Sequence, residues 1–253
     1  MKGGAGVTVN EMGADIQERP QTSGDDQADL KVAPKRFYWA SKRAADIAVS
    51  LALLPAVALI GLCVLIANLF ANPGPLIFKQ TRMGRGCRPF TVYKFRSMLP
   101  HHAPARGPED PVEVDRITSF GHFLRRTHLD ETPQLFNVLK GDMSLIGPRP
   151  DVYEHALRFA ETVSVYPKRH AVRPGITGLS QVTFGYVEGT NLTSLKARTD
   201  ILYIRSASWL LDARIVVRTI YVMSLGRGGK TVPRWTKAKA DPQPTFKPAV
   251  EEA

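Results

Sequence analysis

The sequence predicts an α+β protein that is mostly helical, in which a membrane-associated helix precedes a β-hairpin and a compact domain. Three observations predict this order. Residues 47–71 are apolar without a charged side chain, residues 76–98 form two β-like runs around a Gly- and Pro-containing turn, and helical periods follow. The expected boundaries are 34–72 for the membrane helix and 73–226 for the domain.

Both ends of the chain are polar and lack apolar periodicity. Residues 1–33 carry a net charge of −3 and are expected to be a disordered tail, and residues 227–253 are expected to be a flexible basic tail. The whole chain carries +11, so the part after residue 33 carries +14 and favours an anionic partner: nucleic acid, anionic lipid or a phosphorylated substrate. Two cysteines argue against a disulfide framework and indicate a reducing compartment.

The apolar run is expected to enter a membrane. About 25 residues at a rise of about 1.5 Å can reach across a hydrocarbon core of about 30 Å. Four basic residues lie between positions 35 and 43 and four more between 79 and 88, which does not fit the one-sided positive charge of a simple span. Pro55, near the centre of the run, removes a backbone donor and kinks a helix. We therefore expect a re-entrant helix with its break at Pro55 and both ends on one face of the membrane.

The predicted hairpin places two basic side chains on one strand. Residues 76–83 and 90–98 have β-like composition and flank a turn at 84–89. Lys94 and Arg96 lie two positions apart, so their side chains share one face of the second strand. Such a face is suited to holding phosphate oxygens, although a solvated basic face has the same pattern.

The remaining segments are expected to be helices and loops. Residues 115–128 lead into a short basic helix, and residues 152–165 have the period of an amphipathic helix. Residues 169–178 form a loop punctuated by Gly and Pro, of a kind that lets the backbone approach a ligand closely. Residues 209–225 are strongly apolar but contain three charged side chains, which favours an interfacial or core helix over a second span.

The candidate chemistry is centred on an adjacent carboxylate pair, Asp130 and Glu131. A short helix is predicted directly after the pair, with Thr132 as its N-cap, Pro133 at its first position and Gly141 as its stop. The N-terminus of a helix stabilises negative charge. An acidic pair in this position is also typical of simple helix capping.

The corner at Gly147–Pro150 favours a functional interpretation. It is a rigid turn that presents one guanidinium, Arg149. Carboxylates, a helix N-terminus and a fixed arginine together suit a metal-bound phosphate ester. Gln134 and Asn137, about one turn apart near the helix start, are expected to orient the carboxylate pair.

Four motifs carry a resemblance to a known family. They are KFRSM at Lys94–Met98, LDETPQLFNVLKGDMS at Leu129–Ser144, GPRP at Gly147–Pro150 and RPGITGLSQ at Arg173–Gln181. Together, over residues 40–226, they resemble the bacterial sugar transferases, which are monotopic phosphoglycosyl transferases.

The resemblance implies a reaction and its site. Asp130 would be the nucleophile and would form a covalent phosphosugar intermediate with release of UMP from a UDP-sugar, after which a polyprenyl phosphate accepts the phosphosugar. Glu131 would assist metal binding or proton handling, and Mg²⁺, the expected cofactor, would be bound by Asp130 and Glu131. The expected phosphate or nucleotide contacts are Lys94, Arg96, Arg149 and Arg173.

The resemblance also implies a location. The protein would lie on the cytoplasmic face of a bacterial inner membrane, in contact with membrane lipids and without a nucleic acid partner. Some family members resemble one another in a Ser-Pro pair at the helix break, whereas this chain has Leu54-Pro55. A helix-breaking role of that serine is therefore absent here or moved to Ser50.

Other functions fit less of the sequence. A non-enzymatic, membrane-anchored module that binds anionic lipid or RNA explains the charge and the apolar run but leaves Asp130, Glu131 and the GPRP corner unexplained. A nucleotide-sugar glycosyltransferase with a Rossmann fold would need alternating βαβ units and a Gly-rich phosphate loop, and neither is evident. The identity of the sugar stays open at this point.

Overall fold

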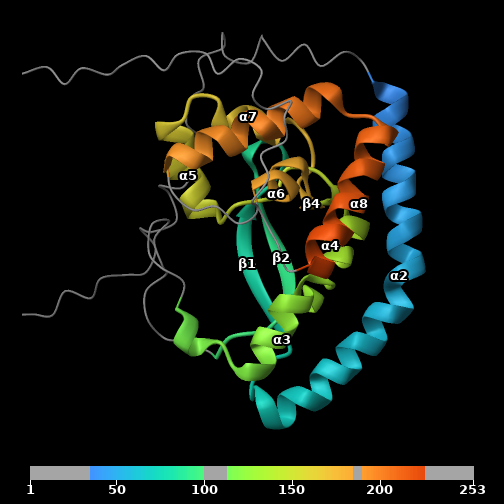
Figure 1. The fold of residues 1–253 in the computed structure, drawn as a ribbon, viewed down its shortest axis with the longest axis vertical. Helices are drawn as coiled ribbons and strands as arrows, with labels where there is room; N and C mark the ends of the chain where they lie inside the picture. The colour runs from blue at the N-terminus through green and yellow to red at the C-terminus, as the bar shows by residue number, and fades with distance from the viewer. Residues whose placement is uncertain (1–34, 100–112, 185–189, 226–253) are drawn as a thin grey trace, which may run out of the picture. The chain divides into compact units, whose positions relative to one another are not determined.

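The computed structural model describes residues 35–99, 113–184 and 190–225 (Figure 1). The predicted tails at 1–33 and 227–253 lie outside these residues. Within them the chain is mostly helical and contains two two-stranded sheets, which confirms the predicted α+β class with a long apolar helix before a β-hairpin. The α-helices are α2 (Arg36–Ala71), α3 (Ser119–Thr127), α4 (Gln134–Lys140), α5 (Tyr153–Thr162), α6 (Leu179–Phe184), α7 (Thr190–Ser206) and α8 (Trp209–Leu225).

Helix α2 is the one helix of the described residues that is long and apolar enough to cross a membrane, and little of its apolar stretch is buried. Its 36 residues extend about 54 Å at a rise of about 1.5 Å per residue. The helix bends along its length (Figure 1) but stays continuous across Pro55. The predicted interruption is therefore a bend, because a proline removes only one backbone hydrogen bond and its neighbours maintain the helix.

Both halves of α2 contact the same domain. In the N-terminal half, the Tyr38 hydroxyl donates to Asp212 of α8 at 2.8 Å, and α8 lies beside this half in Figure 1. In the C-terminal half, Val64 packs with Phe95 and Leu124, which belong to the hairpin and to α3. The apolar residues between these anchors leave most of their surface outside the domain.

The hairpin forms as predicted, with small shifts in its ends. Strands β1 (Ile77–Met83) and β2 (Pro89–Phe95) are antiparallel, with Ile77 opposite Phe95 and Met83 opposite Pro89. The turn between them contains a short 3-10 helix in which Gly86 has φ +66°, a backbone conformation that glycine adopts without steric cost. Arg96 lies just beyond the end of β2.

A second, parallel pair of strands was not predicted. Strand β3 (Ser144–Ile146) pairs with β4 (Gly175–Thr177) inside the segment that the sequence indicated as a loop. Three-residue strands are too short to produce a visible alternation pattern. The pair brings backbones into close approach: a Cβ atom on Gly175 would lie 2.1 Å from the Gly147 nitrogen, and one on Gly178 would lie 2.1 Å from the Gly147 oxygen.

The carboxylate pair lies within a helical run rather than ahead of it. Leu129–Glu131 form a 3-10 turn that continues through positions 132 and 133 into α4. The prediction of Thr132 as N-cap is wrong, because its hydroxyl donates back to the Leu129 carbonyl at 2.8 Å. Gly141 ends α4 with φ +98°, as predicted.

Candidate active site

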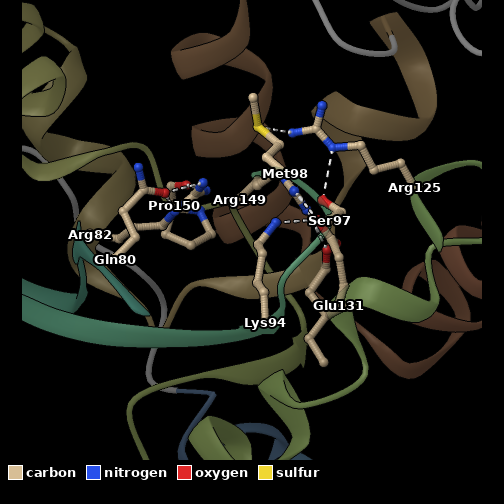
Figure 2. Close-up of polar contacts among 10 residues, drawn as sticks. Gln80, Arg82, Lys94, Ser97, Met98, Arg125, Glu131, Arg149 and Pro150 are labelled. Atoms are coloured by element: carbon tan, nitrogen blue, oxygen red, sulfur yellow. Dashed lines mark hydrogen bonds and ion pairs between the residues drawn. The ribbon is translucent and has the colours of Figure 1, made fainter. Parts of the chain in front are cut away.

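Glu131 is held between two cations. Lys94, on β2, donates to its Oε1 at 2.6 Å, and Arg149, in the corner after β3, donates to its Oε2 at 2.9 Å and also to Oε1 (Figure 2). The side chains of all three residues are largely buried. The sequence placed both cations near phosphate, and the structure brings them together on the carboxylate.

These contacts set the charge states of the site. Burial alone would raise the pKa of Glu131, but Arg149 and Lys94 lower this pKa well below its usual value, so the carboxylate stays ionised. Burial lowers the pKa of Lys94 to about 8, an effect that Glu131 opposes and that Arg149 and Arg82 reinforce. Lys94 is therefore charged at neutral pH but loses its proton far more readily than an ordinary lysine.

Asp130 differs from its neighbour. It is buried, with 7% of its surface exposed, and among the described residues its carboxylate has no hydrogen-bond or ion-pair partner. Burial raises its pKa; Lys94 and Arg125 oppose the increase, and Glu131 adds to it. The oxygens of Asp130 are not among the fully buried atoms that lack a partner, so they stay accessible, and an accessible carboxylate with a raised pKa is a candidate for chemistry or for ligand binding.

The chain around Arg149 is fixed by its backbone. All four carbonyls from position 148 to 151 accept a hydrogen bond from another part of the domain, and the two prolines have no N–H of their own. The donors, in chain order of the acceptors, are the Gly175 nitrogen (2.9 Å), Arg169 Nη2 (2.7 Å), Arg82 Nη1 (2.7 Å) and the Met83 nitrogen (3.1 Å). The GPRP corner is thus held by β1, β4 and the helix that contains Arg169.

Two predicted phosphate contacts lie elsewhere. Arg96 is 5% exposed, and its guanidinium donates to the Asn72 side chain at 3.0 Å and to the Pro75 carbonyl at 2.8 Å, so it fastens the end of α2 to the hairpin. Arg173 donates to the Gly141 carbonyl at 2.8 Å, at the C-terminal end of α4, whereas the carboxylate pair precedes the N-terminal end. The structure does not bring either residue into contact with Glu131.

The two predicted orienting amides also have other contacts. Asn137 accepts from the Tyr93 nitrogen at 3.1 Å and donates to the Thr91 carbonyl at 2.7 Å, so it binds the backbone of β2 instead of the carboxylate pair. Its influence on the site passes through the strand that carries Lys94. Gln134 is 2% exposed, and its Nε2 has no partner among the described residues.

The residues present can supply one open ligand to a metal. The described part of the chain contains no group of three His, Cys, Asp or Glu side chains that could hold an ion. Both oxygens of Glu131 are occupied by cations, so Asp130 is the available carboxylate. This donor set fits Mg²⁺, which proteins bind through one or two carboxylates together with substrate phosphates and water.

A sequence profile of the family described as bacterial sugar transferase matches residues 37–226, which include the whole site. The chain belongs to the bacterial sugar transferase family. The match confirms the resemblance carried by the four motifs.

Several curated relatives of this bacterial sugar transferase have named activities. It is 39% identical over 198 residues to the UDP-N-acetylgalactosamine-undecaprenyl-phosphate N-acetylgalactosaminephosphotransferase of Aeromonas hydrophila, which covers 78% of this chain and 47% of that protein. It is 43% identical over 175 residues to the UDP-glucose:undecaprenyl-phosphate glucose-1-phosphate transferase of Xanthomonas campestris pv. campestris, covering 66% and 36%. The chain spans about half or less of the length of these two relatives.

A shorter relative matches almost end to end. The exopolysaccharide production protein PSS of Rhizobium leguminosarum bv. phaseoli is 42% identical over 195 residues, covering 74% of this sugar transferase and 96% of the relative.

We refer to Lys94 and Arg149, with the Glu131 carboxylate that they bind, as the clamp. Sequence reasoning missed the residues that surround and support this clamp. Arg82 lies among the four basic residues between positions 79 and 88, and Arg169 begins the loop predicted at 169–178, but no contact was predicted for either residue. Asp151 and Asp200, which pair with Arg169, were given no role. The sequence contains no signal for these ion pairs, because Arg169 lies far along the chain from Asp200 and no local pattern connects the two residues.

Proposed function

We propose that this protein transfers a sugar-1-phosphate from a UDP-sugar to polyprenyl (undecaprenyl) phosphate and so initiates the assembly of a polysaccharide. Family membership and the activities named for its relatives support the proposal. The observation that carries it is the contrast within the carboxylate pair. Glu131 is neutralised by Lys94 and Arg149, whereas Asp130 has no hydrogen-bond or ion-pair partner within the described part of the chain and is therefore available to react.

The proposed reaction has two steps. An Asp130 oxygen attacks the phosphorus that bears the sugar, the bond from this phosphorus to the bridging oxygen breaks, and UMP leaves with the electron pair of that bond. An oxygen of the polyprenyl phosphate then attacks the same phosphorus, and the Asp130 carboxylate is the leaving group. The raised pKa of Asp130 makes its carboxylate a stronger nucleophile than an exposed aspartate.

The neighbouring residues prepare the site for a diphosphate. Lys94 and Arg149 are aligned by Glu131, so two cations lie side by side where the donor diphosphate would bind. When bound, Mg²⁺ supplies charge neutralisation on the diphosphate, and Asp130 would hold it here. Because both Glu131 oxygens already bind cations and its pKa is held well below the usual value, we assign Glu131 to orienting these cations instead of to metal ligation or proton handling.

The proposal extends to the membrane. Lys35 donates to the Ala207 carbonyl at 2.8 Å and Asn72 to the Arg96 carbonyl at 3.0 Å, so the two ends of α2 are fastened to one domain. A helix with its ends on opposite sides of a bilayer could not make both contacts. Exposed large hydrophobic side chains are most numerous on α2 and α8. We propose a re-entrant anchor that keeps the site on the cytoplasmic side, at the depth of the acceptor's phosphate.

The function is tested by incubating the purified protein with Mg²⁺, polyprenyl phosphate and a panel of UDP-sugars, including UDP-glucose and UDP-N-acetylgalactosamine. We expect UMP release and a lipid-linked phosphosugar with at least one donor. Asp130→Asn serves as the negative control. Absence of UMP with every donor, together with binding to anionic vesicles, would favour the non-enzymatic membrane module.

The topology is tested with single cysteines at exposed positions on either side of the apolar stretch, Ala40→Cys and Lys79→Cys, after replacement of Cys63 and Cys87. Both cysteines should resist a membrane-impermeant thiol reagent in intact cells and react in inverted vesicles. Opposite labelling of the two positions would establish a spanning helix and refute the re-entrant anchor.

A further inference from the structure

One arginine outside the clamp contacts the backbone of the clamp itself. Arg169 is 1% exposed, and its guanidinium makes contacts in three directions. Nε donates to Asp200 at 2.8 Å, Nη1 pairs with Asp151, and Nη2 donates to the main-chain carbonyl of Arg149 at 2.7 Å. We refer to Arg169, Asp151 and Asp200 as the Arg169 hub.

The hub is extended by two further hydrogen-bond donors. Asp151 also accepts from the Tyr166 hydroxyl at 2.6 Å and from Lys196 of α7 at 2.8 Å. Burial alone would raise the pKa of Asp151, but Lys196 and Arg169 lower this pKa well below its usual value. The acid therefore stays charged and keeps Arg169 in place, and α7 is fastened to the chain directly after the GPRP corner.

The position of the hub explains what fixes the side chain of Arg149. Its carbonyl is bound by Arg169, and its guanidinium binds Glu131 at 2.9 Å. The two prolines that flank Arg149 supply no backbone donors, so the corner depends on donors from elsewhere, and Arg169 donates to the carbonyl of residue 149, whose side chain also donates to the Ile176 carbonyl at 3.3 Å. A displaced carbonyl would displace the guanidinium, because both belong to one residue.

We propose that Arg169 is a positioning residue for the transfer reaction, which sets the placement of Arg149 on Glu131 and on the donor diphosphate. The inference rests on the proposed function. Its chemistry requires arginine, because a planar guanidinium has donors in three directions, whereas a lysine ammonium on a flexible stem cannot serve two carboxylates and a carbonyl in this geometry. Misplacement of a catalytic group by about 1 Å can cost about 100-fold in rate.

The experiment measures the rate constant and the amplitude of UMP release in a single turnover, with the full chain in detergent. Arg169→Lys should lower the rate constant by about 10- to 100-fold, while the amplitude, which counts folded active sites, stays near that of the wild type. A merely structural role would lower the amplitude and leave the rate constant unchanged. Arg158→Lys, at an exposed position on α5, is the matched control and should change neither.

A double-mutant cycle identifies the route of the effect. In an Arg149→Lys background, Arg169→Lys should cost little more, because its partner in the site is already altered. If Arg169→Lys does not fold, Tyr166→Phe carries the same cycle, since it removes only the hydroxyl that donates to Asp151 of the hub and should lower the rate constant by a smaller factor. An unchanged rate constant, or equal losses in both backgrounds, would overturn the inference while wild-type activity leaves the proposed function standing. Absence of UMP release by the wild type with every donor would instead refute the proposed function, and with it the role of Arg169.

Discussion

Two of the buried clusters of charge in the domain differ in how completely they are paired. One, the anchor cluster, consists of Lys42 and Asp46 of α2 with Asp212 of α8. Lys42 lies 3.1 Å from Asp212 and 3.6 Å from Asp46. The other cluster surrounds Asp130 and Glu131.

In the anchor cluster every carboxylate oxygen has a partner. Asp46 accepts from the Ser144 hydroxyl at 2.7 Å and from the Leu145 nitrogen at 3.3 Å, while Asp212 accepts from the hydroxyls of Tyr38 and Tyr203. In the site only Glu131 is paired, and Asp130 has no partner in the described residues. The anchor cluster thus joins α2 to α8, whereas under the proposed function the site keeps Asp130 available to react.

The largest effect is expected from Asp130→Asn. UMP release should fall by about 10⁴-fold or more, because a covalent step is lost. Stability should be unchanged or higher at neutral pH. The folded-state pKa of Asp130 lies above its unfolded value, so the fold disfavours the charged form, and an uncharged amide avoids that penalty.

The stability difference has a defined pH dependence. Any gain should shrink as the pH falls through the raised pKa, since the wild-type carboxyl then becomes neutral itself. Thermal unfolding of the wild type and of Asp130→Asn from pH 4 to 8 measures this difference in stability. Asp115→Asn, at an exposed position, is the control. A large loss of stability in Asp130→Asn would mean that Asp130 is a structural residue like Asp212.

The opposite outcome is expected from Asp212→Asn. Removal of one charge from a buried pair costs about 3–5 kcal/mol, so the unfolding midpoint should fall by several degrees. The rate constant of UMP release in molecules that remain folded should stay close to that of the wild type. Unfolding in detergent and single-turnover kinetics test the two halves of the prediction, and a lowered rate constant at unchanged stability would show that the two clusters are not separate in function.

The smallest effect is a shift in a pH profile. Lys94 must lose its charge as the pH rises through its pKa of about 8, so kcat/KM should decline above that pH. Lys94→Arg should move the decline to higher pH, because a guanidinium stays protonated. Profiles from pH 6 to 10 measure this, with the exposed Lys79→Arg as control. If kcat/KM of Lys94→Arg declines at the same pH as that of the wild type, the decline is caused by a group other than Lys94.

Much of the fold could be predicted because its signals are local. A short stretch of sequence is enough to predict the apolar run of α2, the hairpin turn and the helix at 209–225. Gly141 ends α4 with a φ of +98°, which glycine adopts readily. The strands β3 and β4 were missed because three residues are too short for a pattern. Thr132 was misassigned, because the helical run starts earlier and its hydroxyl bonds backwards.

The site was predictable only where the function depends on adjacent residues. Asp130, Glu131 and Arg149 lie within one segment, so their grouping was visible. Arg96 and Lys94 share a motif, yet one fastens α2 and the other binds Glu131, because β2 ends between them. The contacts of Arg169 join positions 149, 151 and 200, and no local pattern indicates pairs that the fold alone brings together.

The central claim, that Asp130 is left unpaired in order to react, is tested most directly by intact-protein mass spectrometry. The full chain is exposed briefly to the cognate UDP-sugar and Mg²⁺ without polyprenyl phosphate. The account predicts a mass increase of one phosphosugar that maps to Asp130, is missing from Asp130→Asn and disappears when the acceptor is added. An adduct on another residue, or UMP release that requires polyprenyl phosphate from the start, would contradict it.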